Sequence, residues 1–205
     1  MNVLKTKPAE LLHDMRKIYP EAPGLPAGVR MQMHDYQMVL LFGLAQKVAR
    51  EHNWKTARVV EIGSGFGSST IFLCKAVHPM RVVTYTTSAP EAEIVRANLK
   101  RFGCEAEVVV GASWDHLKDW KQELAMVFVD GDHNAIRRDM PFFNKLQWGG
   151  LFLCHDYSSN AGNRVVAEMD VFAAKLGRPF DELCVDADGD GMVGFYRQKG
   201  DRWQL

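Results

Sequence analysis

The chain has 205 residues, of which 47% are hydrophobic and 24% charged, and its 25 basic side chains balance its 25 acidic ones. This length and composition suit one sizeable core in a globular protein. The zero formal net charge gives no electrostatic case for a nucleic-acid or anionic-membrane partner, and no apolar run approaches the roughly 20 residues that span a bilayer.

The amino-terminal stretch MNVLKTKPAELLHDMRKIYP lacks the apolar centre of a secretory signal, so a cytoplasmic location is expected. The four cysteines, Cys74, Cys104, Cys154 and Cys184, form no CxxC pair. Each lies in or beside an apolar stretch. This placement predicts small buried thiols in a reducing compartment rather than a zinc site.

Two helices are expected in the first 54 residues. Leu11, Leu12 and Met15 recur at helical spacing and predict a helix over 9–18. The stretch PEAPGLPAGVR, with three prolines and two glycines, predicts a loop, and a second helix should span roughly 34–51.

From Arg58 onward, apolar β-branched runs alternate with helical patterns. Helices are expected around residues 71–73, from about 90 to 102, and over NRVVAEMDVFAAKL. Strands are predicted at RVVEI, RVVTYT, EVVVG, MVFVD and GGLFLCHD. Continuous apolar strands that alternate with helices indicate an α/β fold whose doubly wound, mostly parallel sheet is buried on both faces.

The tail FDELCVDADGDGMVGFYRQ differs, because two alternating strands flank a turn-rich centre. It predicts an antiparallel hairpin. DADGDG also matches the start of a calcium-binding loop, but the twelfth position counted from Asp186 is Arg197 and not the required glutamate. The turn interpretation is therefore favoured.

The stretch EIGSGFGSST places Gly63, Gly65 and Gly67 directly after a predicted strand. No lysine follows the glycines as in a phosphate-binding P-loop, and the spacing GxGxG differs from the GxGxxG of dinucleotide sites. Two interpretations stay open on this turn alone: a ligand that lies against the backbone, or a close-packed turn without a ligand.

Acidic and histidine residues follow two predicted strands. Asp130, Asp132 and His133 come after the fourth strand, and His155 and Asp156 after the fifth. Neighbouring parallel strands bring their carboxyl ends to one crevice, so these side chains should converge. Buried carboxylates need a cation, and a divalent metal would suit this set. The alternative is that the aspartates cap the following loops, which for Asp132 is an equal interpretation.

The segment from Glu61 to Gly67, together with FVDGDH and GGLFLCHDY, resembles the class I S-adenosylmethionine-dependent methyltransferases over roughly residues 55–198. The resemblance implies a Rossmann-like seven-stranded sheet that ends in an antiparallel hairpin. Where this family usually has an acid after the second strand, the chain has Thr86, and Glu91 is the nearest acid. The resemblance implies a cofactor-binding set of Glu61, Gly63, Ser64, Gly65, Gly67, Thr86, Ser113, Trp114 and Asp130.

The pattern Asp-x-x-His, followed by an Asp after the next strand, resembles a metal-dependent branch of this family. That branch includes macrolide sugar O-methyltransferases and relatives of cephalosporin-biosynthesis methyltransferases. The resemblance places Asp130 and Asp156 at metal-ligand positions and His133 at the general-base position. His155 stands where the sugar enzymes have Glu, and it completes a candidate site for Mg, Mn or another divalent metal.

These observations predict an S-adenosylmethionine-dependent methyltransferase that methylates a hydroxyl of a small molecule with the help of a metal. Residues 1–54 are expected to be a helical extension that forms part of the acceptor pocket, and 55–205 the cofactor-binding domain. The sequence is compatible with a homo-oligomer. Two alternatives remain: a degenerate binding protein, favoured by Thr86 and Ala112, and a nicotinamide-dependent oxidoreductase, disfavoured by the glycine spacing and the hairpin.

Overall fold

The computed structural model describes residues 7–18, 33–53, 55–157, 164–185 and 191–204. The predicted loop at 20–30 and the predicted turn at 186–190 lie outside the described residues. Within the described ranges, no helix combines the length and the apolar character needed to cross a membrane.

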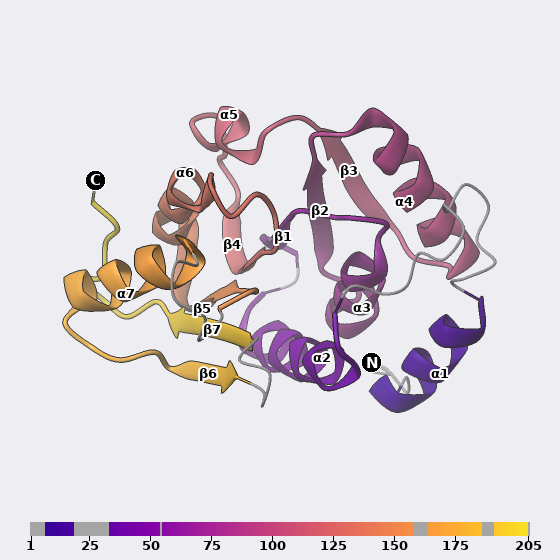
Figure 1. Cartoon of the computed structure of the whole chain (residues 1–205), viewed down its shortest axis with the longest axis horizontal. Coiled ribbons are helices and arrows are strands. Elements are labelled where there is room, and N and C mark those ends of the chain that lie inside the picture. Colours follow the sequence, from indigo (N-terminus) through magenta and orange to yellow (C-terminus); the bar gives the residue numbers. More distant parts are fainter. Residues whose placement is uncertain (1–6, 19–32, 54, 158–163, 186–190, 205) are drawn as a thin grey trace.

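A single sheet of seven strands forms the centre of the molecule (Figure 1). Its spatial order is β3-β2-β1-β4-β5-β7-β6. The first five strands pair in parallel, whereas β7 is antiparallel to both β5 and β6. The strands are β1 (Ala57–Ile62), β2 (Arg81–Thr86), β3 (Ala106–Val110), β4 (Glu123–Val129), β5 (Leu146–Cys154), β6 (Glu182–Val185) and β7 (Gly191–Tyr196). The predicted parallel sheet with a terminal antiparallel hairpin is confirmed.

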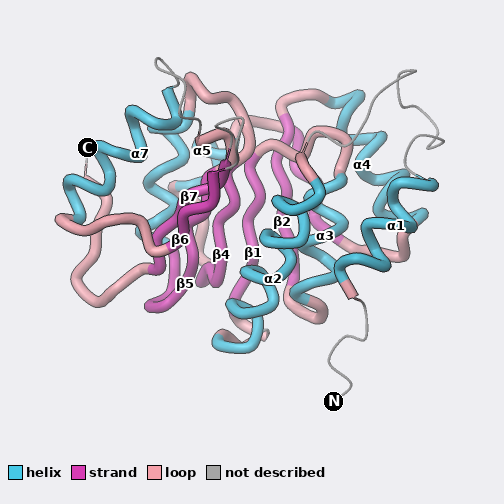
Figure 2. The backbone as a smooth tube through the Cα atoms, turned by 60° about the horizontal axis from the view of Figure 1, so that its bottom comes forward, coloured by secondary structure: helices cyan, strands magenta, loops and turns pink. Residues whose placement is uncertain are grey.

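Helices cover both faces of this sheet, as the tube in Figure 2 shows. They are α1 (Pro8–Ile18), α2 (Asp35–Glu51), α3 (Ser68–Val77), α4 (Ala89–Arg101), α5 (Ser113–Leu117), α6 (Ile136–Asp139) and α7 (Arg164–Leu176), with a 3₁₀ helix η2 (Met140–Lys145) after α6. The central strands are buried almost throughout; in β4 only Glu123 is exposed. This double coverage explains their continuous apolar sequences.

Two hydrophobic clusters fill the space between sheet and helices. One packs α1 to α4 against one face and includes the edge-to-face ring pair of Phe42 and Phe72. The other packs α6, η2 and α7 against the opposite face around Phe143 and Phe172, whose ring centroids are 4.8 Å apart. The two amino-terminal helices therefore belong to the main core.

Candidate functional site

The glycine turn after β1 has a backbone conformation that is unfavourable for residues with a side chain. Gly63, Gly65 and Gly67 all have positive φ, at 93°, 48° and 90°. The amides of Gly63 and Ser64 both donate to the carbonyl of Tyr85 in β2, at 3.0 and 3.1 Å. A Cβ on Gly63 would lie 2.2 Å from the carbonyl oxygen of Asp130. The turn after β1 is thus in direct contact with the residue that follows β4.

Two polar residues are buried here, Glu61 near the end of β1 and Ser64 in the turn. Glu61 is fully buried, and its Oε2 accepts hydrogen bonds from Thr70 at 2.5 Å and Thr84 at 2.6 Å. Burial raises the pKa of Glu61 to about 7. Because Glu61 is fully buried, it can affect a bound cofactor only through the groups to which it is hydrogen-bonded. The hydroxyl of buried Ser64 has no hydrogen-bond partner among the described residues, so it is a polar atom that a ligand could satisfy.

The predicted adenosine-binding residues follow the next two strands. Thr86 ends β2, is 6% exposed, and donates its hydroxyl to Glu91 at 2.9 Å. Ser113 begins α5 after β3, and its hydroxyl donates to Asp139. The ring of Trp114 lies 5.1 Å from the guanidinium carbon of Arg138.

Asp130, His155 and Asp156 converge, as the strand order requires. Asp130 follows β4 and the other two follow β5, the adjacent parallel strand. One ligand atom from each lies within 4.8 Å of the others. Nδ1 of His155 is 3.2 Å from Asp130 Oδ1 and 3.0 Å from Asp156 Oδ1. Yet neither ring nitrogen of this buried histidine has a hydrogen-bond partner within the described chain. These orphaned nitrogens beside two carboxylates fit a divalent cation.

The two aspartates and His155 change one another's pKa values. Burial raises the pKa of Asp130, and His155 opposes that rise. Burial alone would lower the pKa of His155, but the two aspartates raise it to about 10. Asp156, in contrast, has its pKa lowered to about 2, because His155 and His133 outweigh the effect of burial. Without a metal, a protonated imidazole would balance the two acids; a bound divalent metal would replace that charge, with His155 as a neutral ligand.

His133 joins the same group through Asp156. Its Nε2 lies 2.7 Å from Asp156 Oδ2, while Asp156 Oδ1 faces His155. The Asp156 backbone has φ 57°, the left-handed region that non-glycine residues rarely adopt. Such a conformation at a site residue accords with a functional constraint. Asp132 lies outside the cluster and accepts from the amide of Asn134 at 2.9 Å, as a loop cap does.

Asp139 belongs to this region although no motif in the sequence indicates it. This residue is 1% exposed, and burial raises its pKa to about 6. It accepts the hydroxyl of Ser113, so it holds the start of α5 next to the predicted adenine site. The sequence offers little signal for this role, because Asp139 directly follows Arg137 and Arg138 and so resembles an exposed charged residue.

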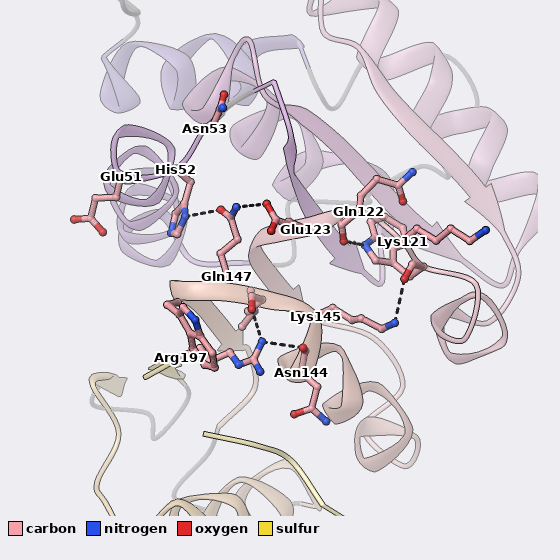
Figure 3. Close-up of a pocket in the computed structure, with 13 residues that line it drawn as sticks. Glu51, His52, Asn53, Lys121, Gln122, Glu123, Asn144, Lys145, Gln147 and Arg197 are labelled. Atoms are coloured by element: carbon pink, nitrogen blue, oxygen red, sulfur yellow. Dashed lines mark hydrogen bonds between the residues drawn. The ribbon is translucent and has the colours of Figure 1, made fainter. Parts of the chain in front are cut away.

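A separate cavity of about 660 Å³ opens at the other end of the strands (Figure 3). Its lining includes His52, Glu123 at the start of β4, and Gln147 near the start of β5. His52 Nδ1 lies 2.7 Å from Gln147 Oε1, and the Gln147 amide donates to Glu123 at 2.5 Å. None of the predicted site residues lines this cavity.

Comparisons with known proteins agree with this geometry. Residues 60–157 match the family model described as a methyltransferase domain. Cofactor-bound Rv0187 from MTB is 25% identical, with a TM-score of 0.68 over 96% of this chain and 93% of that one. The O-methyltransferase of Bacillus cereus, in complex with SAH, is 21% identical, with a TM-score of 0.67 over 96% and 94%. TomG of Streptomyces achromogenes, an O-methyltransferase in complex with SAM, is 22% identical, with a TM-score of 0.67 over 94% and 91%. No curated protein matches the chain in sequence.

The sheet order, the glycine turn and these likenesses define the class I S-adenosylmethionine-dependent methyltransferase fold in its O-methyltransferase-like form. Over residues 60–157 the chain therefore carries a methyltransferase domain.

Proposed function

We propose that this enzyme transfers the methyl group of S-adenosylmethionine to a hydroxyl oxygen of a small molecule, with a divalent metal at the acceptor site. The observation that carries the proposal is the convergence of Asp130, His155, Asp156 and His133 directly beside the glycine turn. A zero net charge and the absence of a basic excess favour a small acceptor over a nucleic acid.

The glycine turn would hold the methionine end of the cofactor. Positive φ at these three positions favours glycine, and glycine leaves the backbone open to a ligand. The unsatisfied Ser64 hydroxyl offers a polar contact. Because Gly63 touches the backbone of Asp130, the methyl donor would lie close to the acidic cluster. Much of the acceleration would come from aligning the two substrates.

His133 would take the proton of the acceptor hydroxyl. The bond that breaks joins the methyl carbon to sulfur, the bond that forms joins it to the acceptor oxygen, and S-adenosylhomocysteine leaves. With Nε2 held by the Asp156 carboxylate, the neutral imidazole keeps its proton there and presents the Nδ1 lone pair as base.

Asp130, His155 and Asp156 would hold the metal, which when bound orients the acceptor hydroxyl and lowers its pKa. Asp156 would serve both functions, because Oδ1 faces the cluster and Oδ2 orients His133. Residues 1–54 would supply part of the acceptor pocket. A cytoplasmic location and a homo-oligomer stay predictions.

Manganese provides a direct test, since its solution electron-spin-resonance signal falls when the ion binds. We expect the wild-type protein to deplete free Mn²⁺ and Asp130→Asn to abolish that depletion. Asp132→Asn is the matched control, because Asp132 lies two residues away and outside the cluster. Equal Mn²⁺ binding by all three proteins, or none by the wild type, would contradict the metal site.

Cofactor use is tested separately by titration calorimetry with S-adenosylhomocysteine. His133→Ala should bind it nearly as well as the wild type, because the proposed base acts on the acceptor. Methyl transfer to a panel of small phenols, catechols and hydroxylated sugars should fall strongly in the same variant. Full activity of His133→Ala would show that His133 is not the base.

A further inference from the structure

Thr86 lies at the end of a strand beside the glycine turn in which the proposed cofactor would bind. It ends β2, and the preceding residue, Tyr85, accepts hydrogen bonds from the amides of Gly63 and Ser64 in the glycine turn. A ribose offers two neighbouring hydroxyls as donors, and a carboxylate binds such a pair with charge-assisted hydrogen bonds. Thr86 has no carboxylate.

The hydroxyl of Thr86 is already used within the protein. It donates its single proton to Glu91 Oε2 at 2.9 Å and accepts the amide proton of Ser88 at 3.2 Å. A hydroxyl has one proton to give. While these two hydrogen bonds are formed, Thr86 cannot donate to a ribose hydroxyl. It can then contribute to ribose binding only by positioning Glu91.

The position of Glu91 in its helix favours such a role. Ser88 caps α4, and Glu91 is the third residue of the helix, with its amide 3.3 Å from the Ser88 hydroxyl. In a capping box, a glutamate at this position bonds back to the amide of the cap residue. Here Thr86 accepts that amide instead. The Glu91 carboxylate is thereby released from the helix cap and held at the end of the strand.

Glu91 also keeps the acceptors that a ribose needs. Its Oε2 has one lone pair beyond the bond to Thr86, and Oε1 accepts no hydrogen bond from the described residues. The side chain is half-buried, which leaves part of it accessible to a ligand. The first turn of α4 stabilises the negative charge. Figure 1 shows how directly β2 leads into this helix.

We propose that Glu91, positioned by Thr86, binds the ribose hydroxyls of the cofactor. The inference rests on the proposed use of S-adenosylmethionine at this site, and it moves the ribose-binding acid from the strand end to the first turn of α4. Thr86 is then a positioning residue and Glu91 the binding residue.

The test is calorimetric and needs no methyl acceptor. S-adenosylhomocysteine and its 2′-deoxyribose analogue are titrated into the wild type, Glu91→Gln and Glu93→Gln. Glu93 is the matched control, because it lies on the same helix but is 74% exposed and pairs with Arg96 at 2.5 Å. Glu91→Gln should weaken binding of S-adenosylhomocysteine about 10- to 100-fold, in line with loss of charge-assisted hydrogen bonds.

The analogue separates ribose recognition from a structural effect. It should bind the wild type more weakly than S-adenosylhomocysteine does, and Glu91→Gln should weaken it much less. Thr86→Val should weaken S-adenosylhomocysteine binding in the same direction, and Thr86→Ser should restore it.

Equal losses for both ligands would overturn the proposal, since they would indicate a damaged helix cap. Unchanged affinity in Glu91→Gln would overturn it while the proposed function stood. A wild type that binds neither ligand would overturn both.

Discussion

Replacement of Gly63 by alanine probes the contact between the glycine turn and the candidate site. Two costs follow from the structure. The backbone has φ 93°, which costs a side-chain-bearing residue about 1–2 kcal/mol. The new Cβ would lie 2.2 Å from the carbonyl oxygen and 2.5 Å from the carbonyl carbon of Asp130, so backbone must move. Overpacking of this kind costs about 1–3 kcal/mol.

Gly63→Ala should therefore lower the free energy of unfolding by about 2–5 kcal/mol, a large part of typical domain stability. Gly103→Ala is the control, because Gly103 has φ 58° but no neighbouring atom within 4 Å of the added Cβ. Only the backbone strain remains there, about 1 kcal/mol. The difference between the two variants isolates the contact with Asp130.

Urea unfolding followed by circular dichroism and tryptophan fluorescence measures both variants. Coincident transitions by the two probes would justify a two-state treatment. Calorimetry with S-adenosylhomocysteine then shows whether displacement of Asp130 also weakens the cofactor site. Equal losses of stability in Gly63→Ala and Gly103→Ala would show that the close approach of Gly63 to Asp130 contributes nothing to the cost.

Three further predictions concern buried polar groups. Because burial raises the pKa of Glu61 from 4.5 to about 7, the fold favours its protonated form, and stability should fall as pH rises through this window. The stability of the wild type relative to Glu61→Gln should drop by about 2–3 kcal/mol between pH 5 and 8, whereas parallel pH curves would contradict this. Asn98→Ala removes a 2.8 Å bond to the Phe66 carbonyl and should cost about 1–2 kcal/mol in urea unfolding; no loss would show that the carbonyl finds another donor. Arg178→Met removes the partner of Asp181 and Asp201 and should cost about 2–3 kcal/mol, with little rescue by Arg178→Lys; full rescue by lysine would reject the need for a planar, multidentate donor.

The sequence made the sheet predictable because its central strands are buried on both faces. A strand such as β4 must then be apolar throughout, and such runs stand out between helical patterns. The meeting of Asp130 with His155 and Asp156 was predictable for a related reason. Parallel neighbours end at the same edge, so residues 25 or so positions apart come together by topology alone.

Individual side-chain bonds were not predictable in this way. Ser113 and Asp139 are 26 positions apart, and their bond depends on the packing of α6 against α5. The bond from Thr86 to Glu91 depends on which acceptor takes the Ser88 amide, and the sequence alone does not decide between the two local geometries. Topology can be inferred from patterns, whereas rotamer-level pairing requires coordinates.

The double contact of Asp156 determines which substitutions can separate ion binding from proton transfer. One carboxylate oxygen faces His155, the other orients His133, and the residue sits on a left-handed backbone. Substitutions there should therefore be thermodynamically coupled to substitutions at both histidines, and their effects should not add. Ion affinity and base strength would change together in any Asp156 variant. Asp130 contacts His155, whereas His133 contacts Asp156. A double-mutant cycle at Asp130 and His133 can therefore assign separate energies to ion binding and to proton transfer.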